Sequence, residues 1–143
     1  MVSRPVTIVT GGGSGIGAGT ARLLAERGHK VILGDYRPET AEEVAAGIVA
    51  TGGDARAMSL DISDEASCRA LYASLAEQGD VATGLVNAAG ITIACPFEDF
   101  PLDDWRRVID TNLIGAMIMS QMFVRQIGDA AGAIVNVSSA AAR

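Results

Sequence analysis

Short apolar runs alternate with longer amphipathic segments along the whole chain. Five runs rich in Val, Ile, Leu and Ala predict buried strands, and a segment with helical spacing separates each run from the next. Apolar runs without polar alternation are typical of strands that are covered on both faces of a sheet. The predicted strands cover residues 6–9, 31–33, 55–60, 84–87 and 133–137.

The first two predicted helices are amphipathic. The first spans residues 16–27 and offers Ile16, Leu23 and Leu24 for burial. The second begins at Pro38, a residue that suits the first turn of a helix. Its expected buried face consists of Ala41, Val44, Ala45 and Ile48.

The last two predicted helices differ from each other. Ser63 is placed to cap the third helix, whose first turn contains acidic residues. The fourth helix, from Leu102 to about Ile127, has apolar side chains on several faces and must bury more than one of them. This pattern suits either a deep core helix or a helix that packs against a partner copy. The apolar face of the third helix consists of Cys68, Leu71, Tyr72 and Leu75.

The alternation of strands and helices predicts the fold class. A βα series of this kind forms a parallel sheet with helices on both faces and right-handed crossovers. No internal repeat or linker interrupts residues 1–143. We therefore expect one α/β domain with a doubly wound parallel sheet, truncated after the fifth strand.

Composition and charge exclude several classes of partner. The chain has 143 residues, of which 49% are hydrophobic and 4% aromatic, so its core must be aliphatic. The net charge is -6 and no basic cluster exceeds Arg106-Arg107, so neither nucleic acid nor a membrane is expected as a partner. Cys68 and Cys95 lack metal-ligand spacing, so no metal site is expected. Without a signal peptide, we expect a cytoplasmic protein.

A glycine-rich turn follows the first predicted strand. The segment Thr10–Gly17 has the sequence TGGGSGIG. Glycines permit a sharp strand-to-helix turn and let a phosphate approach the backbone. The free N–H groups and partial positive charge of the helix N-terminus then suit a pyrophosphate. The alternative is a tight strand-to-helix connection without a ligand.

Asp35 ends the second predicted strand, 18 residues after Gly17. At this position a dinucleotide-binding fold places an acid against the adenosine ribose. A carboxylate accepts hydrogen bonds from the ribose hydroxyls and repels a 2′-phosphate, which favours NAD over NADP. Arg37 keeps NADP open because a guanidinium binds phosphate, and an ordinary acid at a strand end remains the alternative for Asp35.

Five motifs in order resemble those of the short-chain dehydrogenase/reductase family. The glycine turn resembles the family's TGxxxGxG motif, and four further segments resemble its later motifs. The resemblance spans the whole chain and implies a Rossmann-type, dinucleotide-binding domain over residues 1–143. The four further segments are Asp61-Ile62, Asn87–Gly90, Asn112–Gly115 and Ile134–Ser139.

The resemblance implies a role for each motif. Asp35 would bind the adenosine ribose, and Asp61 and Ile62 would flank the adenine. The pyrophosphate would be lined by Gly11, Ser14, Gly15, Ile16 and Gly17. The ribose and the central loop would be bordered by Asn87, Ala88 and Gly90.

Two residues would take part in catalysis if the resemblance holds. Ser139 would hydrogen-bond the reacting oxygen, and the backbone carbonyl of Asn112 would order a water in a proton relay. Each has an alternative: Asn112 could bond neighbouring backbone, and Ser139 could belong to a strand-end turn. Asn87 could tie adjacent loops together.

The family's proton donor, the tyrosine of a Tyr-x-x-x-Lys segment, is absent. Tyr36 and Tyr72 are the chain's tyrosines, and neither has a lysine four residues on. We expect a fragment of an NAD(H)-dependent oxidoreductase that interconverts a secondary alcohol and a ketone, inactive by itself and forming a homo-oligomer when complete. The alternative is a non-catalytic dinucleotide-binding or interaction module.

Overall fold

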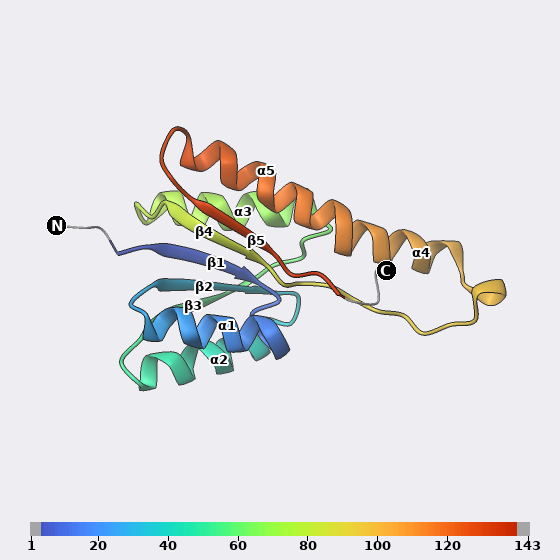
Figure 1. Ribbon diagram of the computed structural model, residues 1–143, viewed down its shortest axis with the longest axis horizontal. Coiled ribbons are helices and arrows are strands. Elements are labelled where there is room, and N and C mark those ends of the chain that lie inside the picture. Colours follow the sequence, from blue (N-terminus) through green and yellow to red (C-terminus); the bar gives the residue numbers. More distant parts are fainter. Residues whose placement is uncertain (1–3, 140–143) are drawn as a thin grey trace.

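The computed structural model describes residues 4–139, which form a five-stranded sheet between two layers of helices (Figure 1). The strand order is β3-β2-β1-β4-β5, and every pair of neighbouring strands is parallel. The predicted doubly wound α/β fold is confirmed. The strands are β1 (Val6–Thr10), β2 (Lys30–Asp35), β3 (Asp54–Ser59), β4 (Ala82–Asn87) and β5 (Ala133–Asn136).

The helices cover the sheet on both faces (Figure 1). Helices α1 (Gly15–Glu26) and α2 (Pro38–Ala50) lie on one face. On the other face lie α3 (Glu65–Glu77) and α5 (Ala116–Ile127). Helix α4 (Leu102–Ile109) extends past the ends of the strands, and two further elements flank it. These are the 3-10 helix η1 (Phe97–Asp99) and the π-helical segment η2 (Asp110–Gly115).

Each face of the sheet has its own core. Alternate side chains along a strand point to opposite faces. In β1, Ile8 therefore packs toward α3 and α5, whereas Val9 packs toward α1 and α2. Both side chains are completely buried. The predicted face of α2 is confirmed, since Ala41, Val44, Ala45 and Ile48 are all buried.

The helix α1 is confirmed, and Leu24 packs partly buried against the core, but the expected burial of Ile16 and Leu23 was wrong because the fully buried side of α1 consists of small residues. Ile16 is 65% exposed and Leu23 is 46% exposed. Small side chains let the axis of α1 lie close to the sheet, which leaves the large side chains pointing outward. The residues of α1 that are buried are Gly17, Ala18, Ala21 and Ala25.

The cap of α3 also differs from the prediction. Asp64 takes the N-cap position, and its Oδ1 accepts a hydrogen bond of 2.9 Å from the backbone N–H of Ala66. The hydroxyl of Ser63 instead donates to Oδ1 of Asp61 at 2.6 Å. Both Ser and Asp can cap a helix. Here the hydroxyl of Ser63 is bound to Asp61, and Asp64 caps α3 instead.

The predicted long helix is present over residues 102–127, but its middle is π-helical. Segment η2 separates α4 from α5 without breaking the helical path. Such segments interrupt the regular hydrogen-bond ladder and are frequent at functional sites. Met119, Met122 and Phe123 bury one side of α5 in the core, whereas Met117 and Val124 are about half exposed.

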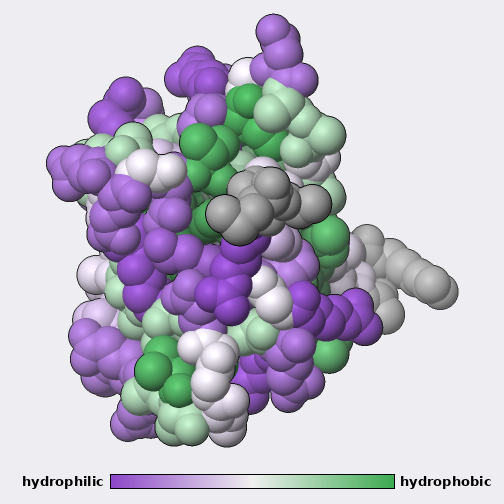
Figure 2. Space-filling model, turned by 90° about the vertical axis from the view of Figure 1, so that its left-hand side faces the viewer, coloured by the Kyte–Doolittle hydropathy of each residue, from purple (hydrophilic) through white to green (hydrophobic). Residues whose placement is uncertain are grey.

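The end of the sheet where the strands begin is mostly hydrophilic, with separate hydrophobic areas (Figure 2). Two ion pairs lie at this end: Arg4 Nη1 is 2.8 Å from Asp54 Oδ2, and Lys30 Nζ is 2.6 Å from Asp80 Oδ2. Each pair joins the first residue of a strand to a segment outside the sheet, and the two pairs share no residue. In the part of the chain that the structure describes, no helix is both long and apolar enough to span a membrane.

Candidate functional site

A cleft of about 730 Å³ opens at the carboxyl ends of the strands. It lies beside the ends of β1 and β4, where Thr10 and Asn87 are register partners. From β1 the chain continues to β2 and β3 on one side, whereas β4 and β5 lie on the other side of β1. The direction in which strands are added to the sheet therefore reverses between β1 and β4. Ligands of open α/β sheets bind in the crevice at such a switch point.

Most of the predicted cofactor-binding residues line this one cleft, although they come from four different parts of the chain. Asn87 does not line it, and neither do the two predicted catalytic residues, Asn112 and Ser139. The predicted residues that line the cleft are Gly11, Ser14, Gly15, Ile16, Gly17, Asp35, Asp61, Ile62, Ala88 and Gly90.

The glycine turn leaves open space beside the N-terminus of α1. Gly15 has a φ of +51°, and a Cβ added to it would meet no atom within 4 Å. By contrast, a Cβ on Gly17 would lie 2.1 Å from the carbonyl oxygen of Gly11, so the helix start packs directly on the turn. Ser14 is the N-cap residue, and its side chain makes no capping hydrogen bond. The first N–H groups of α1 are therefore not capped by Ser14, and this arrangement fits an anionic group.

Asp35 joins the end of β2 to the glycine turn. Its side chain is only 8% exposed and accepts two backbone hydrogen bonds. Gly13 N–H donates to Oδ2 at 2.9 Å, and Arg37 N–H donates to Oδ1 at 3.0 Å. Each carboxylate oxygen keeps a lone pair for a further donor. The acid is thus held at the cleft wall and can still bind hydroxyl groups.

Thr10 joins the two strands that meet at the switch point, a role that the sequence analysis did not assign. The residue is completely buried. Its Oγ1 accepts hydrogen bonds from the N–H groups of Ala88 at 3.2 Å and Ala89 at 3.1 Å. The signal in the sequence was its position as the first residue of the glycine motif. Thr10 fixes the loop after β4 against the glycine turn.

Asp61 is fixed at the wall of the cleft that follows β3. Its Oδ1 accepts hydrogen bonds from both the N–H and the hydroxyl of Ser63, at 2.9 and 2.6 Å. Burial, together with the carboxylates of Asp61 and Asp64, raises the pKa of the nearby Cys68 thiol to about 11. Cys68 therefore stays protonated at neutral pH and is no nucleophile there.

Asn87 and Asn112 both bind other segments of the chain with their side chains. Asn87 Nδ2 donates to Ser120 Oγ at 3.1 Å and to Asn136 Oδ1 at 2.8 Å, which ties β4 to α5 and β5. Asn112 Oδ1 accepts from Ile91 N–H at 2.8 Å, and its Nδ2 donates to Ile91 O at 2.9 Å. For both side chains the structure fits the alternative interpretation, a connection between segments.

Ser139 lies just beyond β5, at the end of the described residues. Its side chain is exposed. The carboxyl end of β5 is also the edge at which the cleft opens, and Val137 N–H still pairs with Asn87 O at 3.0 Å. The predicted fifth strand is therefore confirmed to Asn136, and Ser139 lies at the edge of the sheet at which the cleft opens.

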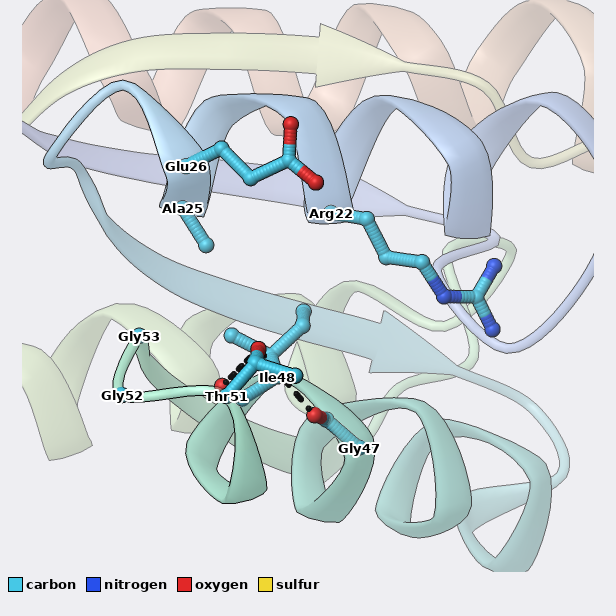
Figure 3. Close-up of a pocket in the computed structure, with 8 residues that line it drawn as sticks. All are labelled: Arg22, Ala25, Glu26, Gly47, Ile48, Thr51, Gly52 and Gly53. Atoms are coloured by element: carbon cyan, nitrogen blue, oxygen red, sulfur yellow. Dashed lines mark hydrogen bonds between the residues drawn. The ribbon is translucent and has the colours of Figure 1, made fainter.

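A second hollow of about 370 Å³ lies between α1 and α2. Figure 3 shows that the side chains of Arg22 and Glu26 run in the same direction along α1, with their charged ends apart. The hydroxyl of Thr51 is used within α2, where it donates to Ile48 O at 2.9 Å. This hollow brings no reactive groups together. Within residues 4–139, no group of His, Cys, Asp or Glu side chains is placed to hold a metal ion.

Comparison with known proteins shows to which family the chain belongs. A family model described as short chain dehydrogenase matches residues 5–143. The chain is 41% identical over 136 residues to cis-4-hydroxycyclohexanecarboxylate dehydrogenase of Sinomonas cyclohexanicum, covering 94% of this chain and 54% of that protein.

Two solved structures are similar over nearly the whole chain. Acetoin dehydrogenase from Enterobacter cloacae has a TM-score of 0.85 and 35% identity, over 97% of this chain and 56% of that one. A metagenomic short-chain oxidoreductase in complex with NADP has a TM-score of 0.90 and 32% identity, over 97% of this chain and 64% of that one. The chain spans about half the length of the curated relatives it matches. On the family match and this shared fold, the protein belongs to the short-chain dehydrogenase/reductase family.

Proposed function

We propose that the chain binds NAD(H) in the cleft at the switch point and serves an oxidoreductase that interconverts a secondary alcohol and a ketone. The observation that carries this proposal is the convergence of ten predicted cofactor-binding residues on one cleft. The names of the relatives support it, since these proteins are dehydrogenases of hydroxylated compounds.

The cleft offers separate positions for the parts of a dinucleotide. The open backbone at Gly15 and the uncapped start of α1 suit the pyrophosphate. Asp35, which keeps lone pairs free on both oxygens, suits the hydroxyls of the adenosine ribose. Asp61 and Ile62 line the wall where the adenine would lie.

The same residues support NAD as the cofactor rather than NADP. The carboxylate of Asp35 is buried and fixed, so a 2′-phosphate would meet a negative charge that cannot move away. Arg37 also lines the cleft, and its side chain is exposed and could bind that phosphate. The relative affinities for NADH and NADPH show whether repulsion of the 2′-phosphate by Asp35 or its binding by Arg37 dominates.

The bound nicotinamide ring would supply the hydride donor or acceptor of the reaction. Ser139 would hydrogen-bond the reacting oxygen from the carboxyl edge of the sheet. Asn112 lies in the π-helical segment η2, where the regular ladder is interrupted, and its backbone carbonyl would order a water. These roles remain proposals that follow from the family.

The tyrosines of this chain are unsuited to the proton transfer. Tyr72 donates its hydroxyl to Met119 O at 2.9 Å, and burial raises its pKa far above the ordinary value. Tyr36 lines the cleft beside Asp35, at the proposed adenosine end. A ketone that accepts hydride needs an acid to protonate the alkoxide. We therefore predict that the purified 143-residue chain gives no NADH-forming turnover with secondary alcohols.

The exposed side of the long helix supports assembly with a second copy. Leu113, Met117 and Val124 are 61%, 49% and 57% exposed, and they follow one another at roughly one- or two-turn spacing. Apolar stripes of this kind mark interaction surfaces. We propose a cytoplasmic homo-oligomer that covers this stripe.

Calorimetric titration with NADH and NADPH tests the proposed function. The wild-type chain is expected to bind NADH more tightly than NADPH. Asp35→Ala should weaken NADH binding by about tenfold or more, because the adenosine ribose hydroxyls lose the charged acceptor of their two proposed hydrogen bonds. Asp54→Ala, which removes an exposed acid at the other end of the sheet, is the matched control. Absence of NADH binding, or equal affinity in Asp35→Ala, would contradict the proposal.

A further inference from the structure

Two cationic side chains of the cleft, Arg37 and Arg107, belong to none of the motifs, and Arg107 is the one that has no proposed role so far. Arg107 lines the cleft from helix α4, and Thr111, about one helical turn further along, lines it as well. Further along the same helical path, Gly115 packs closely against Ile62. A Cβ added to Gly115 would lie 2.7 Å from Ile62 Cγ1. The helix that carries Arg107 is thereby held against the wall formed by Asp61 and Ile62.

Arg107 differs from the neighbouring Arg106 in its hydrogen bonding. Arg106 Nη1 lies 3.1 Å from Asp103 Oδ1 and is hydrogen-bonded to it. Arg107 Nη1 lies 3.9 Å from Asp104 Oδ1, beyond hydrogen-bond distance. Both side chains are about two-thirds exposed. Among residues 4–139, the guanidinium of Arg107 forms a loose ion pair with Asp104 but no hydrogen bond, so its N–H groups can still donate to a ligand.

The charges around Arg107 indicate what kind of ligand it faces. Two carboxylates, Asp35 and Asp61, line the same cleft, so an anionic dinucleotide would enter a site that already carries negative charge. Arg37 and Arg107 are the cationic side chains among the lining residues. Arg37 follows Asp35 directly along the β2 end, whereas Arg107 stands on the helix that packs beside Ile62.

We propose that Arg107 positions the cofactor by contacting its adenine base with the plane of the guanidinium. This inference rests on the proposed function, which places the adenine at Asp61 and Ile62. A planar cation stacks on an aromatic ring and can donate to ring nitrogens, and lysine does neither in the same geometry. Arg107 would therefore hold the base from the helix side while Asp61 and Ile62 hold it from the sheet side.

Titration of AMP and NADH into four proteins tests this inference: the wild-type chain, Arg107→Ala, Arg107→Lys and Arg106→Ala. Arg107→Ala should weaken AMP and NADH binding by the same factor, about five- to tenfold. Arg107→Lys keeps the charge but not the plane, so its affinity should stay several-fold below that of the wild type. Arg106→Ala removes an equally exposed arginine next in the chain and should bind both ligands as the wild type does.

The other outcomes overturn distinct statements. If Arg107→Ala binds AMP as tightly as the wild type, or if Arg107→Lys restores full affinity, Arg107 does not contact the base through its plane. An equal loss in Arg106→Ala would show that general charge, rather than position, matters. If the wild-type chain binds neither ligand, the proposed function itself fails, together with this inference. Thermal unfolding followed by circular dichroism shows whether each variant is folded during the titration.

Discussion

Two parts of the molecule differ in how completely their residues are buried. All residues of β1 are buried, and so are all of β2 except Lys30, whereas every residue of β5 is exposed. Helices α1 and α2 cover their face with small and aliphatic side chains, while α4 buries none of its residues. The part with β1, β2, α1 and α2 is called the glycine-turn half below, and the part with β5, α4, η2, α5 and the residues that follow β5 is called the long-helix half.

The difference separates the proposed cofactor site from the proposed catalytic residues. In the glycine-turn half, Thr10, Asp35 and Gly17 are fixed by short contacts to neighbouring backbone. In the long-helix half, Asn112 and Ser139 are exposed, although the side chain of Asn112 holds Ile91. The residues of the proposed cofactor cleft are thus held in place within this chain, whereas its long-helix half has exposed apolar surface.

The largest expected effect is that of Gly17→Ala. The added Cβ would lie 2.1 Å from the carbonyl oxygen of Gly11, so the glycine turn must move. We expect the free energy of unfolding to fall by about 3 kcal/mol or more and NADH binding to be lost. Urea denaturation and an NADH titration measure both effects.

Gly19→Ala is the matched control within the same helix. No atom lies within 4 Å of a Cβ at this position, so the variant should gain about 0.5–1 kcal/mol of stability from helix propensity. Equal effects of the two substitutions would show that the close approach at Gly17 does not hold the turn.

Two methionines of α5 compare buried and exposed positions of the long-helix half. Met119 is completely buried, whereas Met117 is 49% exposed. Met119→Ala should cost about 3 kcal/mol of unfolding free energy because it leaves a cavity. Met117→Ala should change it by no more than about 0.5 kcal/mol in the monomer. A large loss in Met117→Ala would mean that another copy already covers this side in solution, which sedimentation would show.

Alkaline pH should weaken the core beneath α3 through Cys68. Burial and the carboxylates of Asp61 and Asp64 raise the pKa of its thiol from 9.0 to about 11, so below pH 9 the thiol is mostly neutral in both folded and unfolded chains. Between pH 9 and 11 the unfolded chain loses this proton first, and stability falls by up to about 2–3 kcal/mol. Urea denaturation from pH 8 to 11 should show a shallower loss in Cys68→Ala than in the wild type. Parallel curves would show that Cys68 does not contribute, because Tyr72 titrates in both proteins.

Much of the fold could be predicted from the sequence because the relevant signals are local. Apolar runs located the strands to within one or two residues, and the glycine motif located the cleft. The predicted buried face of α1 was wrong at Ile16 and Leu23, because burial there depends on the distance between the helix and the sheet. The close packing of α1 on the sheet favours Ala18 and Ala21 over Ile16 and Leu23, and periodicity alone cannot reveal that distance.

The candidate site was predictable where motifs carry it and not where packing creates it. The two backbone hydrogen bonds of Asp35 follow from the turn beside it. By contrast, Arg107 belongs to a pair of adjacent arginines, and the sequence does not show which of the two faces the cleft. The π-helical turn likewise has no signal in the sequence, because it depends on how the long helix packs.

Hydrogen–deuterium exchange of the 143-residue chain, with and without NADH, tests whether the cleft at the switch point binds the dinucleotide. We predict that NADH slows exchange in the glycine turn, at residues 35–37 and 61–63, and in the loop at residues 88–91. We predict no change in the hollow between α1 and α2 or in β5. Protection confined to that hollow, or no protection at all, would show that the cleft at the switch point is not the dinucleotide site.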